Sequence, residues 1–180
     1  MDCQAGLIAA AVKDKSFTER GASLVAAARR GRMMIIHIQV GFRSGLPEAS
    51  SRNPLMAAIK NSPERQQLFQ GKSGAIHPSF APESNEVVIT KHRVSAFTGT
   101  ELDMILRAHD IETLVMFGIS TSGVVLSTCL DAFDRDYRVV VVKDLCADRD
   151  EALHACLTER FFPNRGTVMI ASEVESTLGA

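Results

Sequence analysis

The chain has 180 residues, of which 46% are hydrophobic, and a formal net charge of -1 with both signs spread along its length. These values suit a single domain over residues 1–180 with a sizeable core, and no basic stripe argues for a nucleic-acid partner. The apolar runs are too short to span a bilayer, so we expect no membrane partner.

The cysteines lie far apart in the chain and form no Cys-x-x-Cys pair. They are Cys3, Cys129, Cys146 and Cys156. This spacing predicts reduced thiols rather than a disulfide framework or a zinc site. Because the chain also opens without a charged and apolar leader pattern, we expect a cytoplasmic protein.

Apolar periodicity and turn residues predict an alternation of helices, strands and long loops in the first half of the chain. Pro78 and Pro82 are expected to prevent a regular element in the last of these loops. The expected elements are a helix over 16–32, a strand over 33–40, a loop over 41–53, a short helix over 54–60, a turn over 64–69 and a loop over 71–85.

The second half continues the alternation more regularly. The expected elements are a strand over 87–90, a helix over 101–109 capped by Thr100, a strand over 114–117, a helix to about 135, a strand over 139–142, a helix to 161 capped by Asp148 or Asp150, a strand over 167–171 and a short final helix. Strands that alternate with helices predict an α/β protein, with a parallel sheet covered by helices on both faces.

The stretch from Leu114 to Asp148 is the most informative part of the chain, because it reads as strand, tight turn, helix and strand. Its turn, residues 118–124, follows the carboxyl end of a strand, where open α/β sheets bind ligands. Asp2 and Lys91 also stand at expected strand ends and are expected to converge with this turn. A lysine beside an aspartate keeps the carboxylate ionised, and a partly buried pair of this kind can transfer a proton.

Three motifs occur in a specific order: Asp2-x-Gln4, KHRVSAFTGTELDMILR at 91–107, and GISTSGVVLSTCLDAFDRDYRVVVVKDLCAD at 118–148. With them the chain resembles the isochorismatase-like superfamily, often called cysteine hydrolases, over nearly its full length. The resemblance implies a doubly wound α/β/α sandwich with a six-stranded parallel sheet. It also implies a catalytic Asp, Lys and Cys at the carboxyl edge, and it matches Asp2 to the acid/base aspartate and Lys91 to the lysine.

The resemblance also assigns a role to the turn that follows Gly118. It implies that backbone N–H groups at the start of the helix, near Gly123 and Val124, stabilise negative charge. A non-proline cis peptide of the family maps to Ile119–Ser120.

Val124 departs from the family pattern, because it stands where the nucleophilic cysteine belongs. An isopropyl group cannot attack a carbonyl, so a thioester route is closed. Cys129 lies more than a helical turn further on, and Ser122 has no mapped histidine to activate it. True isochorismatases, which this chain resembles in lacking that cysteine, cleave a vinyl ether by protonation and attack of water.

We therefore expect a hydrolase of a small molecule that uses Asp2 and Lys91 for acid–base chemistry, with a vinyl ether favoured over an amide. The alternative is a family member without catalysis that serves as a ligand-binding or oligomeric scaffold protein. A valine at position 124 is compatible with both hypotheses. Asp2 and Lys91 favour the first, because a scaffold without catalysis needs neither residue. The resemblance implies a homodimer or homotetramer.

The beginning of the chain is a second departure, since the family has an apolar central strand before the aspartate and here only Met1 precedes Asp2. Loss of a central strand leaves two ladders of backbone groups unpaired, at a cost on the order of a kcal/mol for each group. We expect that residues precede Met1 in the natural protein, or else that the fold is compromised.

No metal or other cofactor is expected. The residues after His37 include Gln39, Gly41, Phe42 and Arg43, which do not form the Asp-x-His cluster of the metal-binding nicotinamidases. We interpret His37 as a half-buried histidine with a hydrogen-bond partner. The glycine spacing of the 118–123 turn is not that of a dinucleotide site, so nucleotide binding is a poor third hypothesis.

Several other residues are candidates for the wall of a pocket. His92 and Arg93 either shape it or support a loop, Phe42 and Phe97 either line it or pack in the core, and Thr121 and Ser122 are also ordinary helix-capping residues. The candidate pocket residues are Gln4, Phe42, Arg43, His92, Phe97, Thr121 and Ser122.

Overall fold

The structure, a computed structural model, describes residues 1–178. Its strands are β1 (Ile36–Val40), β2 (Val87–Lys91), β3 (Thr113–Ile119), β4 (Arg138–Ala147) and β5 (Thr167–Met169). Its α-helices are α1 (Ala5–Ala11), α2 (Phe17–Arg30), α3 (Pro54–Lys60), α4 (Pro63–Gln67), α5 (Gly71–Gly74), α6 (Leu102–Ala108), α7 (Leu126–Phe133), α8 (Glu151–Cys156) and α9 (Ala171–Leu178).

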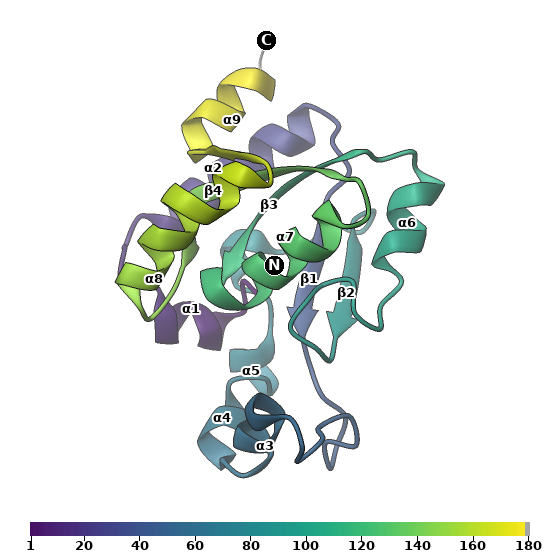
Figure 1. The fold of residues 1–180 in the computed structure, drawn as a ribbon, viewed down its shortest axis with the longest axis vertical. Coiled ribbons are helices and arrows are strands. Elements are labelled where there is room, and N and C mark those ends of the chain that lie inside the picture. The colour runs from purple at the N-terminus through teal and green to yellow at the C-terminus, as the bar shows by residue number, and fades with distance from the viewer. Residues whose placement is uncertain (179–180) are drawn as a thin grey trace.

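The strand pairings are parallel, β1 with β2 and β4 with both β3 and β5. Helices pack against both faces of these strands, and Figure 1 shows α7 in front of them and α2 behind. One hydrophobic cluster includes residues of α6 and α7, and a second includes residues of α2 and α9. The predicted α/β architecture of parallel strands covered by helices on both faces is therefore confirmed. Within residues 1–178, however, the strands form a two-stranded and a three-stranded sheet, and not the six-stranded sheet that the resemblance implied.

Met1 and Asp2 occupy the position of a strand between β1 and β3. The Met1 amino group donates to Phe117 O at 2.9 Å, and Ile119 N–H donates to Met1 O at 3.2 Å. On the other side, Asp2 N–H donates to Ile38 O at 2.7 Å. These bonds join the β1–β2 pair to the β3–β4–β5 group at one end.

Gly118 is required by this close approach. A Cβ atom built at residue 118 would overlap the carbonyl group of Met1, and the φ angle of Gly118 is +152°. A side chain at this position would displace the first residues of the chain from β3.

Several element boundaries differ from the predicted ones. β1 begins at Ile36 rather than Met33, because its ladder with β2 begins where Ile36 pairs with Val87. α1 was not predicted, and the loop expected over 71–85 contains α5 and a 3₁₀ turn over Pro78–Phe80. The expectation that Pro78 excludes a regular element was wrong, because proline is well suited to the first position of a helical turn.

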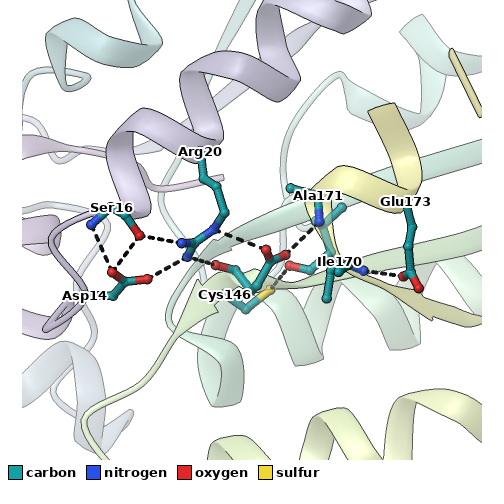
Figure 2. Close-up of polar contacts among 9 residues, drawn as sticks. Asp14, Ser16, Arg20, Cys146, Ile170, Ala171 and Glu173 are labelled. Atoms are coloured by element: carbon teal, nitrogen blue, oxygen red, sulfur yellow. Dashed lines mark hydrogen bonds and ion pairs between the residues drawn. The ribbon is translucent and has the colours of Figure 1, made fainter. Parts of the chain in front are cut away.

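A polar network fixes the start of α2 against β4 and α9 (Figure 2). Arg20 forms ion pairs with Asp14 at 2.6 Å and with Asp144 at 3.1 Å. Asp144 also accepts a hydrogen bond from Ala171 N–H at 2.8 Å, at the start of α9. Three segments that are distant in the sequence are thereby held together beside the sheet.

Candidate functional site

Asp2 and Lys91 form a buried ion pair at the carboxyl edge of the strands. Asp2 Oδ2 lies 2.8 Å from Lys91 Nζ, and the two residues are only 5% and 2% exposed. Lys91 is the last residue of β2, whereas Asp2 has a positive φ of 54°, which turns the chain out of the strand position toward α1. The structure thus brings together the two side chains expected to converge.

The two oxygens of the Asp2 carboxyl group have different surroundings. Oδ2 faces Lys91, but the buried Oδ1 has no hydrogen-bond partner among residues 1–178. Burial raises the pKa of Asp2 above its ordinary value, and the positive charge of Lys91 opposes that rise. A carboxyl group with a raised pKa and one uncommitted oxygen is suited to exchange a proton with a bound molecule.

Gln4 holds this edge of the sheet together with its side-chain amide. Its Nε2 donates to Val40 O at 3.0 Å and to Gly74 O at 2.6 Å, and its Oε1 accepts from Val40 N–H at 2.9 Å. Lys91 O in turn accepts from Gly41 N–H at 3.1 Å. Because backbone groups bind both ends of its amide, the Gln4 side chain fixes the chain that follows Asp2 to the end of β1.

The turn after β3 contains the cis peptide bond Ile119–Ser120 and continues as a single π-helical turn over Thr121–Val125. Val124 is 2% exposed. Gly123 N–H donates to Ser120 O at 3.2 Å, so this amide already has an intramolecular acceptor.

The hydroxyl groups of Thr121 and Ser122 do not cap the helix in the way expected. Ser122 N–H donates to Asp148 Oδ2 at 2.7 Å, so the capping acceptor is the residue that directly follows β4. Thr121 is fully buried, and its Oγ1 lies 2.8 Å from His154 Nδ1. Neither contact could be predicted from a local pattern, since the partners lie 26 and 33 residues further along the chain.

The buried thiol groups of the chain are poorly suited to replace the missing nucleophile. Burial raises the pKa of Cys129 to about 11 and that of Cys146 to about 12. Burial also raises the pKa of Cys3, the neighbour of Asp2 in the chain. Since the thiolate is the reactive form, these cysteines are inert near neutral pH.

Side chains of the loop after β1 pack against Phe69, which follows α4, and against His92, the neighbour of Lys91 in the chain. Phe42 packs edge-on against Phe69 with ring centroids 5.4 Å apart, and its centroid is 6.4 Å from that of His92. His92 Nδ1 lies 2.6 Å from Gly41 O, and because a carbonyl only accepts, this nitrogen carries the proton.

Two charged residues complete this loop cluster. Arg43 forms an ion pair with Glu48, whose Oε1 is also 4.0 Å from His92 Nε2. Sequence reasoning missed Glu48, because a single carboxylate in a loop carries no signal of its own.

Phe97 belongs to the core. Its ring stacks on Tyr137 with centroids 5.9 Å apart, and the Arg135 guanidinium lies 5.0 Å from its centroid. The other reading of Phe97, as a pocket wall, is therefore disfavoured by its contacts.

No group of three or more His, Cys, Asp or Glu side chains within residues 1–178 is arranged to hold a metal ion. Within the same range, no helix has the length and apolar character needed to cross a membrane.

The Isochorismatase domain family matches residues 1–173 of the chain. Among curated proteins, maleamate amidohydrolase of Pseudomonas putida is 28% identical over 137 residues, which are 76% of this chain and 62% of that protein. Ureidoacrylate amidohydrolase of Methylorubrum extorquens is 33% identical over 136 residues, 70% of this chain and 55% of that protein. The chain thus spans less than two thirds of the length of these relatives.

Solved structures of similar fold cover the chain more completely. An isochorismatase family protein from Burkholderia thailandensis superimposes with a TM-score of 0.86 and 27% identity, over 99% of this chain and 93% of that one. N-carbamoylsarcosine amidase from Thermoplasma acidophilum has a TM-score of 0.69 and 25% identity, over 87% of this chain and 83% of that one.

Proposed function

Since the chain belongs to the isochorismatase family, we propose that it hydrolyses a small molecule with Asp2 as general acid and base, and without a cysteine nucleophile. The observation that carries this proposal is the buried Asp2–Lys91 pair, whose Oδ1 atom has no partner among residues 1–178. Such an oxygen, in a carboxyl group of raised pKa, is placed to give a proton and to take one back.

A vinyl ether is the substrate class that this arrangement suits best. The protonated Asp2 gives its proton to the terminal carbon of the enol ether, which leaves an oxocarbenium ion. Water adds to that ion as the Asp2 carboxylate accepts one of its protons, and the resulting hemiketal separates into an alcohol and a carbonyl compound. Lys91 stabilises the carboxylate formed between these steps.

Val124 disfavours the amide route. The two curated relatives named above are amidohydrolases by name, but the position matched to the nucleophile is occupied here by a buried aliphatic side chain. An acyl-enzyme intermediate needs a nucleophile whose conjugate acid can be deprotonated, and the buried thiols have raised pKa values.

A panel of purified substrates tests the proposal. Small vinyl ethers of carboxylic acids should be hydrolysed in a reaction that is lost in Asp2→Asn, whereas maleamate and ureidoacrylate should be hydrolysed slowly or not at all. Turnover of the amides with accumulation of a covalent acyl-enzyme would contradict it.

A second candidate function is ligand binding without turnover, and Val124 is the observation in its favour. The two functions differ in a simple readout. A scaffold would bind members of the panel in calorimetry without converting any, and Asp2→Asn would then alter affinity alone.

We further propose a cytoplasmic homodimer or homotetramer. The four cysteines are free, which suits a reducing compartment. Met104 on α6 and Phe133 on α7 are 67% and 48% exposed, and such side chains favour burial against another subunit. Light scattering on the purified protein gives the subunit number directly.

A further inference from the structure

A buried hydroxyl group fixes the start of the π-helical turn that follows β3. Thr121 is the first residue of this turn and is fully buried. Its Oγ1 atom lies 2.8 Å from Nδ1 of His154, a residue of α8, and this is the only side-chain hydrogen bond of Thr121 within residues 1–178. Because a buried hydroxyl group without a partner is costly, the contact restricts where Thr121 can lie.

The connection between β4 and α8 holds the same turn at a second point. Asp148 accepts from Ser122 N–H through Oδ2 at 2.7 Å and from Asp150 N–H through Oδ1 at 3.3 Å. Asp150 in turn caps α8, because its Oδ1 accepts from Leu153 N–H at 3.0 Å. The helix that carries His154 is therefore itself fixed to the turn.

The beginning of the turn is linked to Asp2. Ile119 N–H donates to Met1 O at 3.2 Å, and Met1 directly precedes Asp2 in the chain. Ile119 is the last residue of β3, and only Ser120 separates it from Thr121. A displacement of Thr121 would therefore also move the attachment of Asp2 to β3.

The middle of the turn is linked to Lys91. Lys91 Nζ donates to Arg93 O at 3.0 Å, so the segment after β2 holds the ammonium group in place. A Cβ atom built at Gly123 would lie 3.9 Å from Cγ1 of Val94, the next residue of that segment. The turn thus borders the supports of both members of the acid–base pair.

We propose that His154 is a positioning residue for the reaction at Asp2 and Lys91, and that it acts through the hydroxyl group of Thr121. This role rests on the proposed hydrolysis, in which Asp2 and Lys91 are the acid–base pair. His154 touches no substrate in this account. Misplacement of reacting groups by about 1 Å can lower a rate by about 100-fold, even when its cause lies away from the reacting atoms.

Two variants of Thr121 separate the hydroxyl group from the shape of the side chain. Thr121→Val keeps the branched shape and should lower kcat by about 10- to 100-fold. Its KM should change by less than about threefold, because substrate binding is not the step affected. Thr121→Ser keeps the hydroxyl group and should restore most of kcat.

Thr158→Val is the matched control for Thr121→Val. Thr158 is 5% exposed and lies on the helical turn that continues α8. Its hydroxyl group donates only to backbone carbonyls, at 2.9 Å to His154 O and at 3.3 Å to Ala155 O. This variant should keep the kcat of the wild type. A kcat that is equal in Thr121→Val and Thr158→Val would overturn the proposal.

Two variants of His154 examine the other partner. The side-chain amide nitrogen of asparagine is as many bonds from Cα as Nδ1 of histidine, whereas that of glutamine corresponds to Nε2. His154→Asn should therefore keep most of kcat, and His154→Gln should lose it. The double variant Thr121→Val/His154→Gln should fall no further than either single variant, because only one contact is lost. Losses that multiply would show that the two residues act independently, which would overturn the proposal.

Hydrogen exchange reports on the turn without any substrate. Exchange of the Ser122 amide should quicken by about tenfold or more in Thr121→Val relative to Thr158→Val. The Met116 amide, within the β3–β4 ladder, should change much less. Unchanged exchange at Ser122 would contradict the role of the Thr121 hydroxyl group. A wild type that hydrolyses no compound would instead contradict the proposed hydrolysis, so the two failures are distinct.

Discussion

The two ends of the boundary between β1 and β3 differ in how completely they are assembled. At the carboxyl end, Met1 and Asp2 bond to both strands, Gln4 fixes the chain to Val40, and Lys91 neutralises Asp2. At the other end the same two strands flank an apolar cavity. The candidate reaction site therefore lies at the end of this boundary where hydrogen bonds join the two strands, and the other end is open.

Asp2 is held in place by the backbone hydrogen bonds of Met1 and Asp2 and by one ion pair. Changes at the closed end should alter both activity and stability, whereas changes at the open end should alter stability first.

The largest effect is expected for Asp2→Asn. Loss of the general acid and base should lower kcat by about 10²- to 10⁴-fold on any hydrolysed compound. Asp134→Asn, on an exposed aspartate, should have no such effect. Because the single change leaves Lys91 buried without a counter-charge, the double variant Asp2→Asn/Lys91→Gln should be measured as well. Full turnover in folded samples of either Asp2 variant would exclude the proposed role.

Gly118→Ala tests the attachment of the first residues to β3. The added methyl group overlaps the Met1 carbonyl, so we expect a loss of about 2 kcal/mol or more in the free energy of unfolding, together with a fall in kcat. Gly31→Ala is the matched control, because the nearest atoms to a Cβ there are at an ordinary 3.5 Å. Urea unfolding of both variants measures the difference, and equal stability would mean that Met1 is not held against β3.

Glu86→Gln tests how the open end is held. The Glu86 carboxylate binds Arg29 at 2.8 Å and His37 at 2.8 Å. The hydrogen bond from Arg29 lowers the pKa of Glu86 to about 2, so its contribution is present above pH 4.5 and is lost as pH falls toward 2. We expect the variant to lose about 1–3 kcal/mol at pH 7.

The difference in the free energy of unfolding between wild type and Glu86→Gln should shrink as pH falls below 4.5. The kcat of the variant at pH 7 should stay nearly unchanged. Glu159→Gln, on an exposed face, serves as the control. A difference in unfolding free energy that is constant from pH 7 to pH 2 would rule out the ionised carboxylate as its cause.

The smallest effect is expected for the exposed thiol. Cys156→Ser should alter the free energy of unfolding by less than about 0.5 kcal/mol and leave kcat unchanged. Brief treatment of the folded wild type with iodoacetamide should likewise spare activity, because the other three cysteines are buried. Inactivation that follows the modification of one cysteine would contradict a mechanism without a thiol.

The sequence predicted those parts of the fold and site that depend on local patterns. Parallel strands alternating with helices follow from apolar runs and turn residues, and the pairing of Asp2 with Lys91 follows from strand ends that share one edge. The side-chain partners of Thr121 and Ser122 could not be predicted, because they come from residues distant in the sequence.

The later start of β1 and the role of Gln4 could not be predicted from the sequence, for a related reason. Residues 33–35 have the apolar character of a strand, but their ladder depends on which neighbours they find in the sheet. Gln4 was a candidate pocket residue, and only the structure shows that Val40 and Gly74 use its amide.

The pH dependence of kcat in wild type and Lys91→Gln tests the coupling of Asp2 and Lys91 most directly. If protonated Asp2 starts the reaction, kcat is high at low pH and falls as pH rises through the pKa of Asp2, which burial raises above 3.8. Lys91 lowers that pKa, so Lys91→Gln should move the fall toward higher pH by about one unit or more. A fall at unchanged or lower pH in the folded variant would contradict acid catalysis by this pair.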